Sequence, residues 1–387
     1  MKILHVIHSV DPRGGGPIEG IRQLIPAMLA HGIETEVMSL DVAGAPGTAD
    51  FPVPLHTLGS AQSGYGYSAQ AVPWLKANRE RYHAVIVNGL WQYGGLAIWR
   101  SLNGTSTPYY VYPHGMLDPW FKRRYPLKHL KKWLYWPWAE YRVLRDAAAV
   151  LFTAEEERLE ARKSFWLYQC RERITGYGIV DPPANADEQR ESFLARFPEL
   201  RGKRLILFLG RVHEKKGCDL LLRAWAELLA SGAVPGEFQL VMAGPAVHAY
   251  GAEMQALARD LKIEPRVTWT GMLTGDLKWG SLRAAGAFIL PSHQENFGIS
   301  VVEALACGVP VLISNRVNIW REIEADGAGL VSEDDLPGTG KMIRHWLELD
   351  PPAREKMRSM ARQCFLRRFE IAAVADALQA ILLENTV

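Results

Sequence analysis

The chain has 387 residues, of which 48% are hydrophobic and 22% are charged, and its formal net charge is +2. This length predicts two or three domains with sizeable cores, and the composition is that of an ordinary globular protein. A net charge this small gives no overall attraction for nucleic acid, so nucleic-acid binding is not expected.

The four cysteines are scattered along the chain and form no Cys-x-x-Cys pair. The sequence therefore signals neither a zinc site nor a disulfide framework, and we expect a reducing, cytoplasmic setting. The apolar run at residues 3–7 is too short for a signal peptide, and no segment has the roughly 18 apolar residues of a membrane span. We expect a protein that is soluble or bound to a membrane surface.

The first half of the chain alternates apolar strands with helices, which predicts a doubly wound α/β domain. Three glycines, Gly14, Gly15 and Gly16, lie in the loop between the first strand and the first helix. They do not match G-x-G-x-x-G, which disfavours a nicotinamide dehydrogenase. A flexible turn and a close backbone approach to a diphosphate or acceptor both remain open. The strands expected here are 3–7, 36–40, 84–88, 109–112 and 148–152, with a helix at about 18–30.

A polar, proline-rich segment at 181–187 predicts a domain boundary. Beyond it the alternation restarts, so we expect two α/β domains, 1–180 and 188–365. We expect the C-terminal helix, about 366–387, to pack back on the first domain. The second half should contain strands 204–209, 239–243, 267–270, 287–290 and 310–314, helices at about 218–229, 253–261 and 297–307, and a helical tail at about 352–384.

Two carboxylates, Glu295 and Glu303, follow the 287–290 strand. Glu295 lies in the loop at the carboxyl end of the strand, where open α/β sheets bind ligands. Glu303 lies among apolar residues of the expected helix, where an unpaired carboxylate is costly. Eight helical steps would separate the two by roughly 12 Å, about the reach from a sugar across a diphosphate to a ribose. A pair of glutamates is more often solvated, but this context favours a polar ligand site.

Two cations, Arg211 and Lys216, lie between Gly210 and Gly217 in the loop after the 204–209 strand. Fixed cations at a helix entrance suit a diphosphate leaving group, because negative charge grows there as a sugar bond breaks. Two solvated surface cations are the alternative. The sequence has no Walker-type phosphate loop, no H-E-x-x-H motif and no D-x-D pair, so we expect phosphate handling without a metal.

Basic and aromatic residues interleave between positions 120 and 138, a mixture suited to anionic lipid headgroups. A solvated basic helix with buried tryptophans is an equally good interpretation, and nucleic-acid stacking is less favoured because no such motif accompanies the segment. The residues expected to meet a membrane or acceptor are Trp120, Lys122, Arg123, Arg124, Lys131, Lys132 and Trp133. Elsewhere, a lone histidine, His114, follows the 109–112 strand at its carboxyl end, and such a residue is more often structural.

The spacing Gly210-Arg211…Lys216-Gly217, together with Glu295-x7-Glu303, closely resembles the retaining glycosyltransferases of family 4. The resemblance is strong over 204–331 and weaker in the N-terminal half, through the glycine loop and Pro113-His114-Gly115. It implies a GT-B fold, in which two Rossmann-like doubly wound domains face each other across a cleft.

The resemblance also implies a role for each matched position. Arg211 and Lys216 would bind the diphosphate of a UDP- or GDP-sugar, Glu295 would hold the donor sugar, Glu303 the ribose, and His114 would face the transferring carbon. His114, Arg211, Lys216 and Glu295 would thus be catalytic, with no metal or cofactor. His114 is followed by glycine rather than the aspartate of some relatives, so acceptor handling is not carried over. The donor site would further include Gly15, Gly16, Gly271, Met272, Leu273, Asn296, Phe297, Gly298 and Ile299.

The sequence therefore predicts a glycosyltransferase that adds a hexose or related sugar to a lipid-linked or polysaccharide acceptor on the inner face of the cytoplasmic membrane. One alternative is a transferase with a soluble sugar or sugar-phosphate acceptor. Another is a non-catalytic nucleotide-sugar-binding or membrane scaffold protein. Intact cations and carboxylates at all four matched positions weigh against the scaffold.

Overall fold

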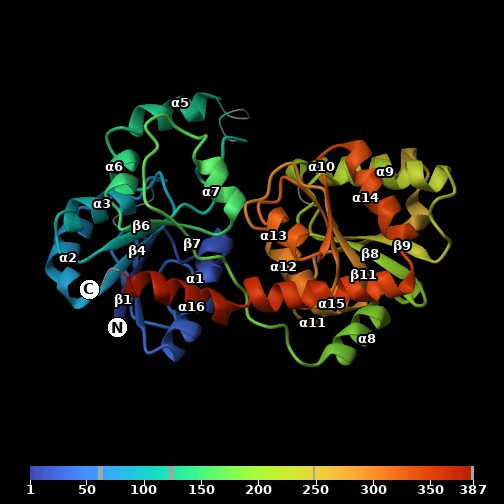
Figure 1. Cartoon of the computed structure of the whole chain (residues 1–387), viewed down its shortest axis with the longest axis horizontal. Helices are drawn as coiled ribbons and strands as arrows, with labels where there is room; N and C mark the ends of the chain where they lie inside the picture. The colour runs from blue at the N-terminus through green and yellow to red at the C-terminus, as the bar shows by residue number, and fades with distance from the viewer. Residues whose placement is uncertain (60–63, 121, 123–125, 247–248, 385–387) are drawn as a thin grey trace. The chain divides into compact units, whose positions relative to one another are not determined.

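A computed structural model describes residues 1–59, 64–120, 122, 126–246 and 249–384 (Figure 1). The chain divides into two compact units, Met1–Val180 with Glu370–Val387, and Asp181–Phe369. The segment 181–187, placed between the domains from the sequence, belongs to the second unit.

The described part of the first unit contains a seven-stranded parallel sheet with the order β3-β2-β1-β4-β5-β6-β7. Its central strands are buried on both faces, which explains why they read as nearly continuous apolar runs. The strands are β1 (Lys2–Ile7), β2 (Glu34–Ser39), β3 (Leu55–Thr57), β4 (Ala84–Asn88), β5 (Tyr109–Tyr112), β6 (Ala149–Phe152) and β7 (Glu172–Ile174). The helices are α1 (Gly16–Ala30), α2 (Ala71–Asn78), α3 (Tyr93–Leu102), α5 (Pro126–Tyr135), α6 (Glu140–Arg145), α7 (Glu155–Ala161) and α16 (Ile371–Leu383).

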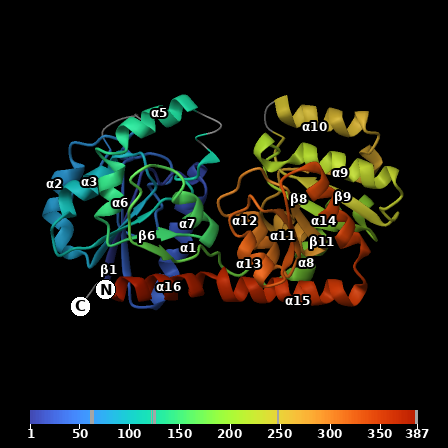
Figure 2. The ribbon, with the colours of Figure 1, turned by 45° about the horizontal axis from the view of Figure 1, so that its top comes forward.

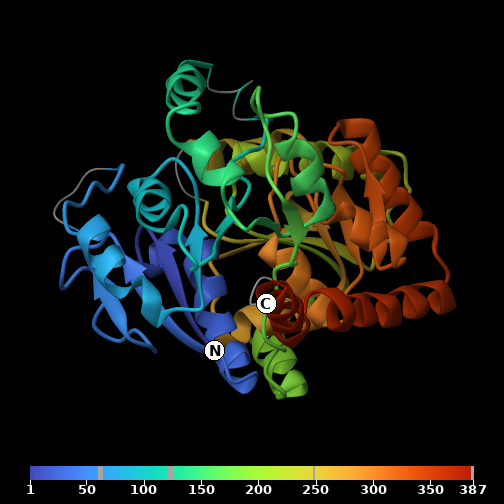
Figure 3. The same ribbon diagram turned by 60° about the vertical axis from the view of Figure 1, so that its left-hand side comes forward.

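Successive strand residues point to opposite faces of this sheet and enter two different cores. Ile3 belongs to the core under α1 and α16, whereas Leu4 belongs to the core under α2, α3 and α6. Figure 2 shows α16 running beside α1 on one face of the sheet. The α5 helix lies at the periphery of this unit in all three views (Figures 1, 2 and 3).

The second unit repeats the architecture with a six-stranded parallel sheet, in the order β10-β9-β8-β11-β12-β13 within the described residues. Among its described helices, α9 packs with α14, α8 with α11, and α12 with α15. The strands are β8 (Arg204–Leu209), β9 (Phe238–Ala243), β10 (Val267–Gly271), β11 (Ala285–Leu290), β12 (Val311–Ser314) and β13 (Gly329–Ser332). The helices are α8 (Ala186–Arg196), α9 (Cys218–Ala230), α10 (Ala249–Asp260), α11 (Gly275–Ala284), α12 (Ile299–Ala306), α13 (Trp320–Ala325), α14 (Leu336–Glu348) and α15 (Pro351–Arg368).

One expectation about a helix start is wrong. The helix expected from residue 297 begins at Ile299, after Gly298 in the left-handed region at φ 76°, so Glu295 precedes the helix and helical rise does not set its distance from Glu303. The helical tail expected at about 352–384 is present and consists of two helices, α15 and α16. It breaks because Phe369 is buried against Phe297, and Ile371 then donates a backbone hydrogen bond to Ile179.

No helix in the described ranges is long and apolar enough to cross a membrane.

Candidate functional site

Each sheet has one point at which the strand order reverses direction, and ligands of doubly wound folds bind beside such points. In the second unit the reversal lies between β8 and β11, because β9 and β10 continue to one side and β12 and β13 to the other. The loops that leave β8 and β11 at their carboxyl ends carry Arg211, Lys216 and Glu295. These three predicted donor residues therefore lie at the switch point.

Lys216 and Glu295 come from these two loops and form an ion pair, Nζ to Oε2. Lys216 ends a short 3-10 helix, Glu214–Lys216, and Gly217 then turns the chain into α9 with φ at 64°. A Cβ atom on Gly217 would lie 2.0 Å from the carbonyl oxygen of Pro291. Only glycine lets the β8 loop approach the end of β11 this closely, and that approach brings the lysine to the carboxylate.

The loop that carries Glu295 is held from the neighbouring loop after β12. The Glu295 amide donates to the carbonyl oxygen of Arg316 at 2.9 Å, and the Asn318 amide donates to the Glu295 carbonyl at 3.0 Å. The Asn318 side chain also donates to Asn296 Oδ1 at 3.3 Å. These contacts fix the backbone of the loop.

Glu303 lies on α12, and its side chain is largely buried. Which residue pairs with this carboxylate was not predicted from the sequence. The partner is Lys278 of α11, whose Nζ lies 2.7 Å from Glu303 Oε1. This ion pair offsets the free-energy cost of burying a carboxylate among apolar neighbours. Sequence reasoning missed Lys278 because it lies 25 positions away on another helix.

Burial and the nearby charge of Arg211 lower the pKa of Lys216 to about 8. The Glu295 carboxylate opposes this shift because it favours the charged ammonium. At neutral pH the lysine is therefore a cation, held close to a carboxylate and to a second cation. This is an arrangement that a bound diphosphate would complete.

The remaining predicted donor residues of this unit have different settings. Gly271 ends β10 with φ at 70°, Met272 is exposed and Leu273 is buried. Phe297 turns its side chain into the core, and Ile299 opens α12. Arg211 is exposed.

His114, Gly15 and Gly16 belong to the first unit. His114 follows β5 in a left-handed turn with φ at 48°, and Gly115 continues it at φ 73°. The Gly115 amide donates to Glu157 Oε1 at 2.5 Å, and the amide and hydroxyl of Thr153 donate to Glu157 Oε2. A buried carboxylate thus holds the turn that presents the histidine. Gly15 precedes α1 with φ at 80°, and the Gly16 carbonyl accepts a hydrogen bond from Tyr177.

The basic and aromatic segment is only partly described, because Arg123 and Arg124 lie outside the described residues. Lys122 and Lys131 are exposed, and the Lys132 ammonium lies 4.7 Å from the centre of the Trp91 ring. Trp120 is half-buried and Trp133 is exposed. The segment is therefore a surface helix with lysines, and Trp136 is the tryptophan it buries.

Among the described residues, no group of three His, Cys, Asp or Glu side chains is placed to hold a metal ion.

The "Glycosyl transferases group 1" family model matches residues 189–364, and the "Glycosyl transferase 4-like domain" model matches residues 15–171. The chain is built from the two domains of a GT-B glycosyltransferase of the family 4-like type. The first match covers the site of the second unit, and the second match covers Gly15, Gly16 and His114 of the first unit.

Alpha-D-kanosaminyltransferase of Streptomyces kanamyceticus is 29% identical to the chain over 250 residues, which are 64% of this chain and 63% of that protein. The chain thus spans less than two thirds of this relative's length. Sucrose-phosphate synthase from Thermosynechococcus elongatus has a TM-score of 0.75 at 19% identity, over 99% of both chains. HepE from Anabaena, solved with UDP and glucose, has a TM-score of 0.73 at 16% identity, over 99% of this chain and 100% of that one. Both structures confirm the fold, two Rossmann-like domains with parallel sheets.

Proposed function

We propose that the chain is a retaining, metal-independent glycosyltransferase that takes a sugar from a UDP- or GDP-sugar and adds it to a lipid-linked or polysaccharide acceptor. The observation that carries this proposal is the Lys216–Glu295 pair at the switch point between β8 and β11. HepE, which shares the fold, was solved with UDP and glucose, and this supports a nucleotide-sugar donor.

In the proposed reaction, the bond between the anomeric carbon of the sugar and the diphosphate oxygen breaks, and its electron pair leaves with the nucleoside diphosphate. The acceptor hydroxyl oxygen forms the new bond on the same face, and its proton passes to the departing phosphate. Negative charge therefore grows on the diphosphate in the transition state. Lys216 and Arg211 are the cations that would stabilise it, and Glu295 would exchange its lysine contact for sugar hydroxyls.

A thermal-shift panel of UDP, GDP, ADP and their sugars tests the donor site, because a ligand that binds only the folded state raises its melting temperature. We expect one nucleotide series to stabilise the protein and Glu303→Ala to weaken that effect. Arg211→Ala should slow transfer more than it weakens donor binding. Full transfer activity in both variants would contradict the assignment.

Retention and metal independence have their own tests. Proton NMR of the first-formed product should show the anomeric configuration of the donor sugar, and an inverted product would exclude retention. Transfer should continue at an unchanged rate in excess EDTA, and a loss that Mg²⁺ or Mn²⁺ restores would show that a metal takes part.

The lipid-linked acceptor is supported by an apolar face on α5. Leu127, Leu130 and Leu134 are 79%, 55% and 61% exposed, and their spacing places them on one side of the helix. Trp133 and Trp166 extend the face, with ring centroids 6.0 Å apart. Exposed lysines of the same segment flank it. An apolar face bordered by cations is typical of a helix that lies in an anionic membrane interface.

Flotation with phosphatidylcholine vesicles that contain an anionic lipid tests this surface. We expect wild type to float, with less binding after Leu127→Ser, Leu130→Ser and Leu134→Ser together, or after Lys122→Ser, Lys131→Ser and Lys132→Ser. The matched control changes three exposed leucines outside α5: Leu29→Ser, Leu366→Ser and Leu383→Ser. Equal flotation of all four proteins would contradict membrane docking through α5.

A soluble acceptor is the second candidate. The names of kanosaminyltransferase and sucrose-phosphate synthase mention no lipid or polysaccharide, and both proteins resemble this chain. A product that partitions into water and carries no lipid would favour this candidate.

A further inference from the structure

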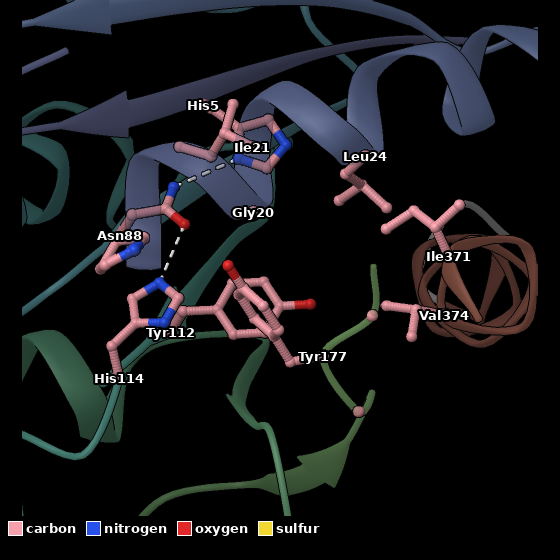
Figure 4. A pocket seen from close by; sticks show the side chains of 13 residues that line it. His5, Gly20, Ile21, Leu24, Asn88, Tyr112, His114, Tyr177, Ile371 and Val374 are labelled. Atoms are coloured by element: carbon pink, nitrogen blue, oxygen red, sulfur yellow. Dashed lines mark hydrogen bonds between the residues drawn. The ribbon is translucent and has the colours of Figure 1, made fainter. Parts of the chain in front are cut away.

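Three side chains of the first unit form a hydrogen-bonded row from β1 through β4 to the turn after β5 (Figure 4). His114 Nε2 lies 3.2 Å from Asn88 Oδ1, and Asn88 Nδ2 lies 3.2 Å from His5 Nδ1. The three residues line a cavity of about 30 Å³. That volume is enough to hold a water molecule.

The orientation of the Asn88 amide follows from its other neighbours. Its two Nδ2 protons are shared among three acceptors: His5 Nδ1 and the carbonyl oxygen of Ile86, both at 3.2 Å, and the more distant carbonyl oxygen of Val6 at 3.4 Å. Backbone carbonyls only accept hydrogen bonds, so the nitrogen end of the amide must face them. The oxygen end then faces His114, and the bond to His5 Nδ1 places the remaining proton of His5 on Nε2.

The fixed amide oxygen selects one tautomer of His114. An amide oxygen only accepts, so His114 Nε2 must carry the proton. Burial lowers the pKa of His114 to about 4, and the ring is therefore neutral at physiological pH. A neutral imidazole with its proton on Nε2 has a lone pair on Nδ1. In the described part of the chain no hydrogen bond to Nδ1 is found.

The groups around the ring leave this state undisturbed. Tyr112 stacks on it with ring centroids 5.3 Å apart, and burial raises the pKa of the Tyr112 hydroxyl far above neutrality. His5 is neutral because burial and His114 lower its pKa to about 4. Burial also raises the pKa of Tyr177, on the far side of the cavity. Glu157 holds the Gly115 amide and thus faces the turn rather than Nε2.

We propose that Asn88 is a positioning residue that fixes His114 with its proton on Nε2, so that Nδ1 accepts a hydrogen bond from a hydroxyl of the sugar substrate. His5 supports it by holding the amide nitrogen. The inference rests on the proposed function for the identity of the ligand, but the tautomer itself does not. A histidine fixed in this state is a hydrogen-bond acceptor and not a general acid.

NMR of the full chain with ¹⁵N-labelled histidine tests the tautomer directly. Long-range proton–nitrogen correlation separates protonated from unprotonated ring nitrogens, and the His114 signals are assigned by their loss in His114→Gln or by contacts with the Tyr112 ring. We expect unprotonated Nδ1 and protonated Nε2 throughout pH 6–8. The opposite tautomer, or an imidazolium in this range, would overturn the inference.

Asn88→Asp tests the consequence for transfer. An aspartate beside Nε2 favours the imidazolium and raises the pKa of His114, so Nδ1 becomes a donor at acidic pH. We expect the variant to lose kcat/KM about tenfold for each pH unit below the new pKa and to recover at higher pH. The matched control is Asn78→Asp, the same change on α2, which should keep the wild-type pH profile.

A folded Asn88→Asp protein with a raised His114 pKa and an unchanged pH profile would overturn the role of Nδ1. If this variant fails to fold, Asn88→Ala serves in its place: a mixed tautomer with lowered kcat/KM supports the proposal, and an unchanged rate overturns it. A wild-type chain that transfers no sugar would refute the proposed function and leave the tautomer standing, because the NMR measurement needs no substrate.

Discussion

The two units reverse their strand order at equivalent points, yet they line these points with different chemistry. In the second unit the side chains are ions in pairs: the loops after β8 and β11 bring Lys216 to Glu295, and helices α11 and α12 bring Lys278 to Glu303. In the first unit, between β1 and β4, the side chains are neutral hydrogen-bonding groups. The fold is shared, and each site's chemistry comes from the residues at its strand ends.

Burial lowers the pKa of a basic side chain at both sites, but the two side chains have different charge states at neutral pH. It lowers the pKa of Lys216 from 10.5 to about 8 and that of His114 from 6.5 to about 4. At neutral pH the lysine is still a cation and the histidine is still neutral. One site thus suits a diphosphate, and the other suits an uncharged sugar.

Of the changes proposed here, removal of the Lys216 charge should have the largest effect on transfer. Lys216→Met removes a cation from the proposed diphosphate site, and we expect kcat to fall by about 10² to 10³, as for loss of one group that stabilises developing charge. Steady-state transfer kinetics give the measurement. Lys215→Met, the preceding lysine in the same loop, is the matched control and should stay within about threefold of wild type. Equal losses in both variants would mean that only the loop's total charge matters.

The close packing of the β8 loop on β11 makes a prediction about stability. Gly217→Ala would place a Cβ atom 2.0 Å from the Pro291 carbonyl oxygen, and we expect a loss of about 2–3 kcal/mol from the free energy of unfolding. Gly232→Ala, at the other end of α9, has a similar φ of 73° and nothing within 4 Å, so it should cost only about 1 kcal/mol. Urea denaturation of both variants checks the difference, which would vanish if the β8 loop were loosely packed. In the first unit, a Cβ atom added to the loop glycine Gly15 would likewise have no atom within 4 Å.

The charge state of Lys216 predicts an alkaline limit to transfer. The folded-state pKa of about 8 lies below the ordinary 10.5, so the cation is present below pH 8 and is lost as the pH rises through it. We expect kcat/KM to fall about tenfold between pH 8 and pH 9. The matched variant is Lys216→Arg, whose guanidinium stays charged and should remove the limit at the cost of some activity. An unchanged limit in Lys216→Arg would assign it to another group.

The fold was predictable because strands buried on both faces of a parallel sheet consist of continuous apolar residues, which are visible in the sequence. The strands at 84–88, 109–112 and 204–209 were placed to the residue, and the confirmed GT-B fold follows from their alternation with helices. The ends of helices were harder to predict from the sequence. The start of α12 depends on the left-handed Gly298, and the break before α16 depends on where Phe369 packs.

The residues of the candidate sites were predictable as positions at strand ends, but their partners were not. Lys278 reaches Glu303 from another helix, and Asn88 orients His114 from another strand. No local pattern records either contact, since both depend on how separate elements pack. Asn88 could have been recognised as a candidate site residue because it is a polar residue at the end of the predicted strand 84–88, which is β4.

Lys278 gives the smallest predicted effect and tests whether the ion pairs of the second unit serve the donor. If Lys278 holds one oxygen of Glu303 so that the other meets the ribose, Lys278→Met should raise the donor KM about fivefold and leave kcat unchanged, as loss of one hydrogen bond would. Lys341→Met, an exposed lysine on α14, is the control. A fall in kcat with unchanged KM would instead place Lys278 beside the reacting bond, and the Lys278–Glu303 pair would then serve catalysis rather than donor binding.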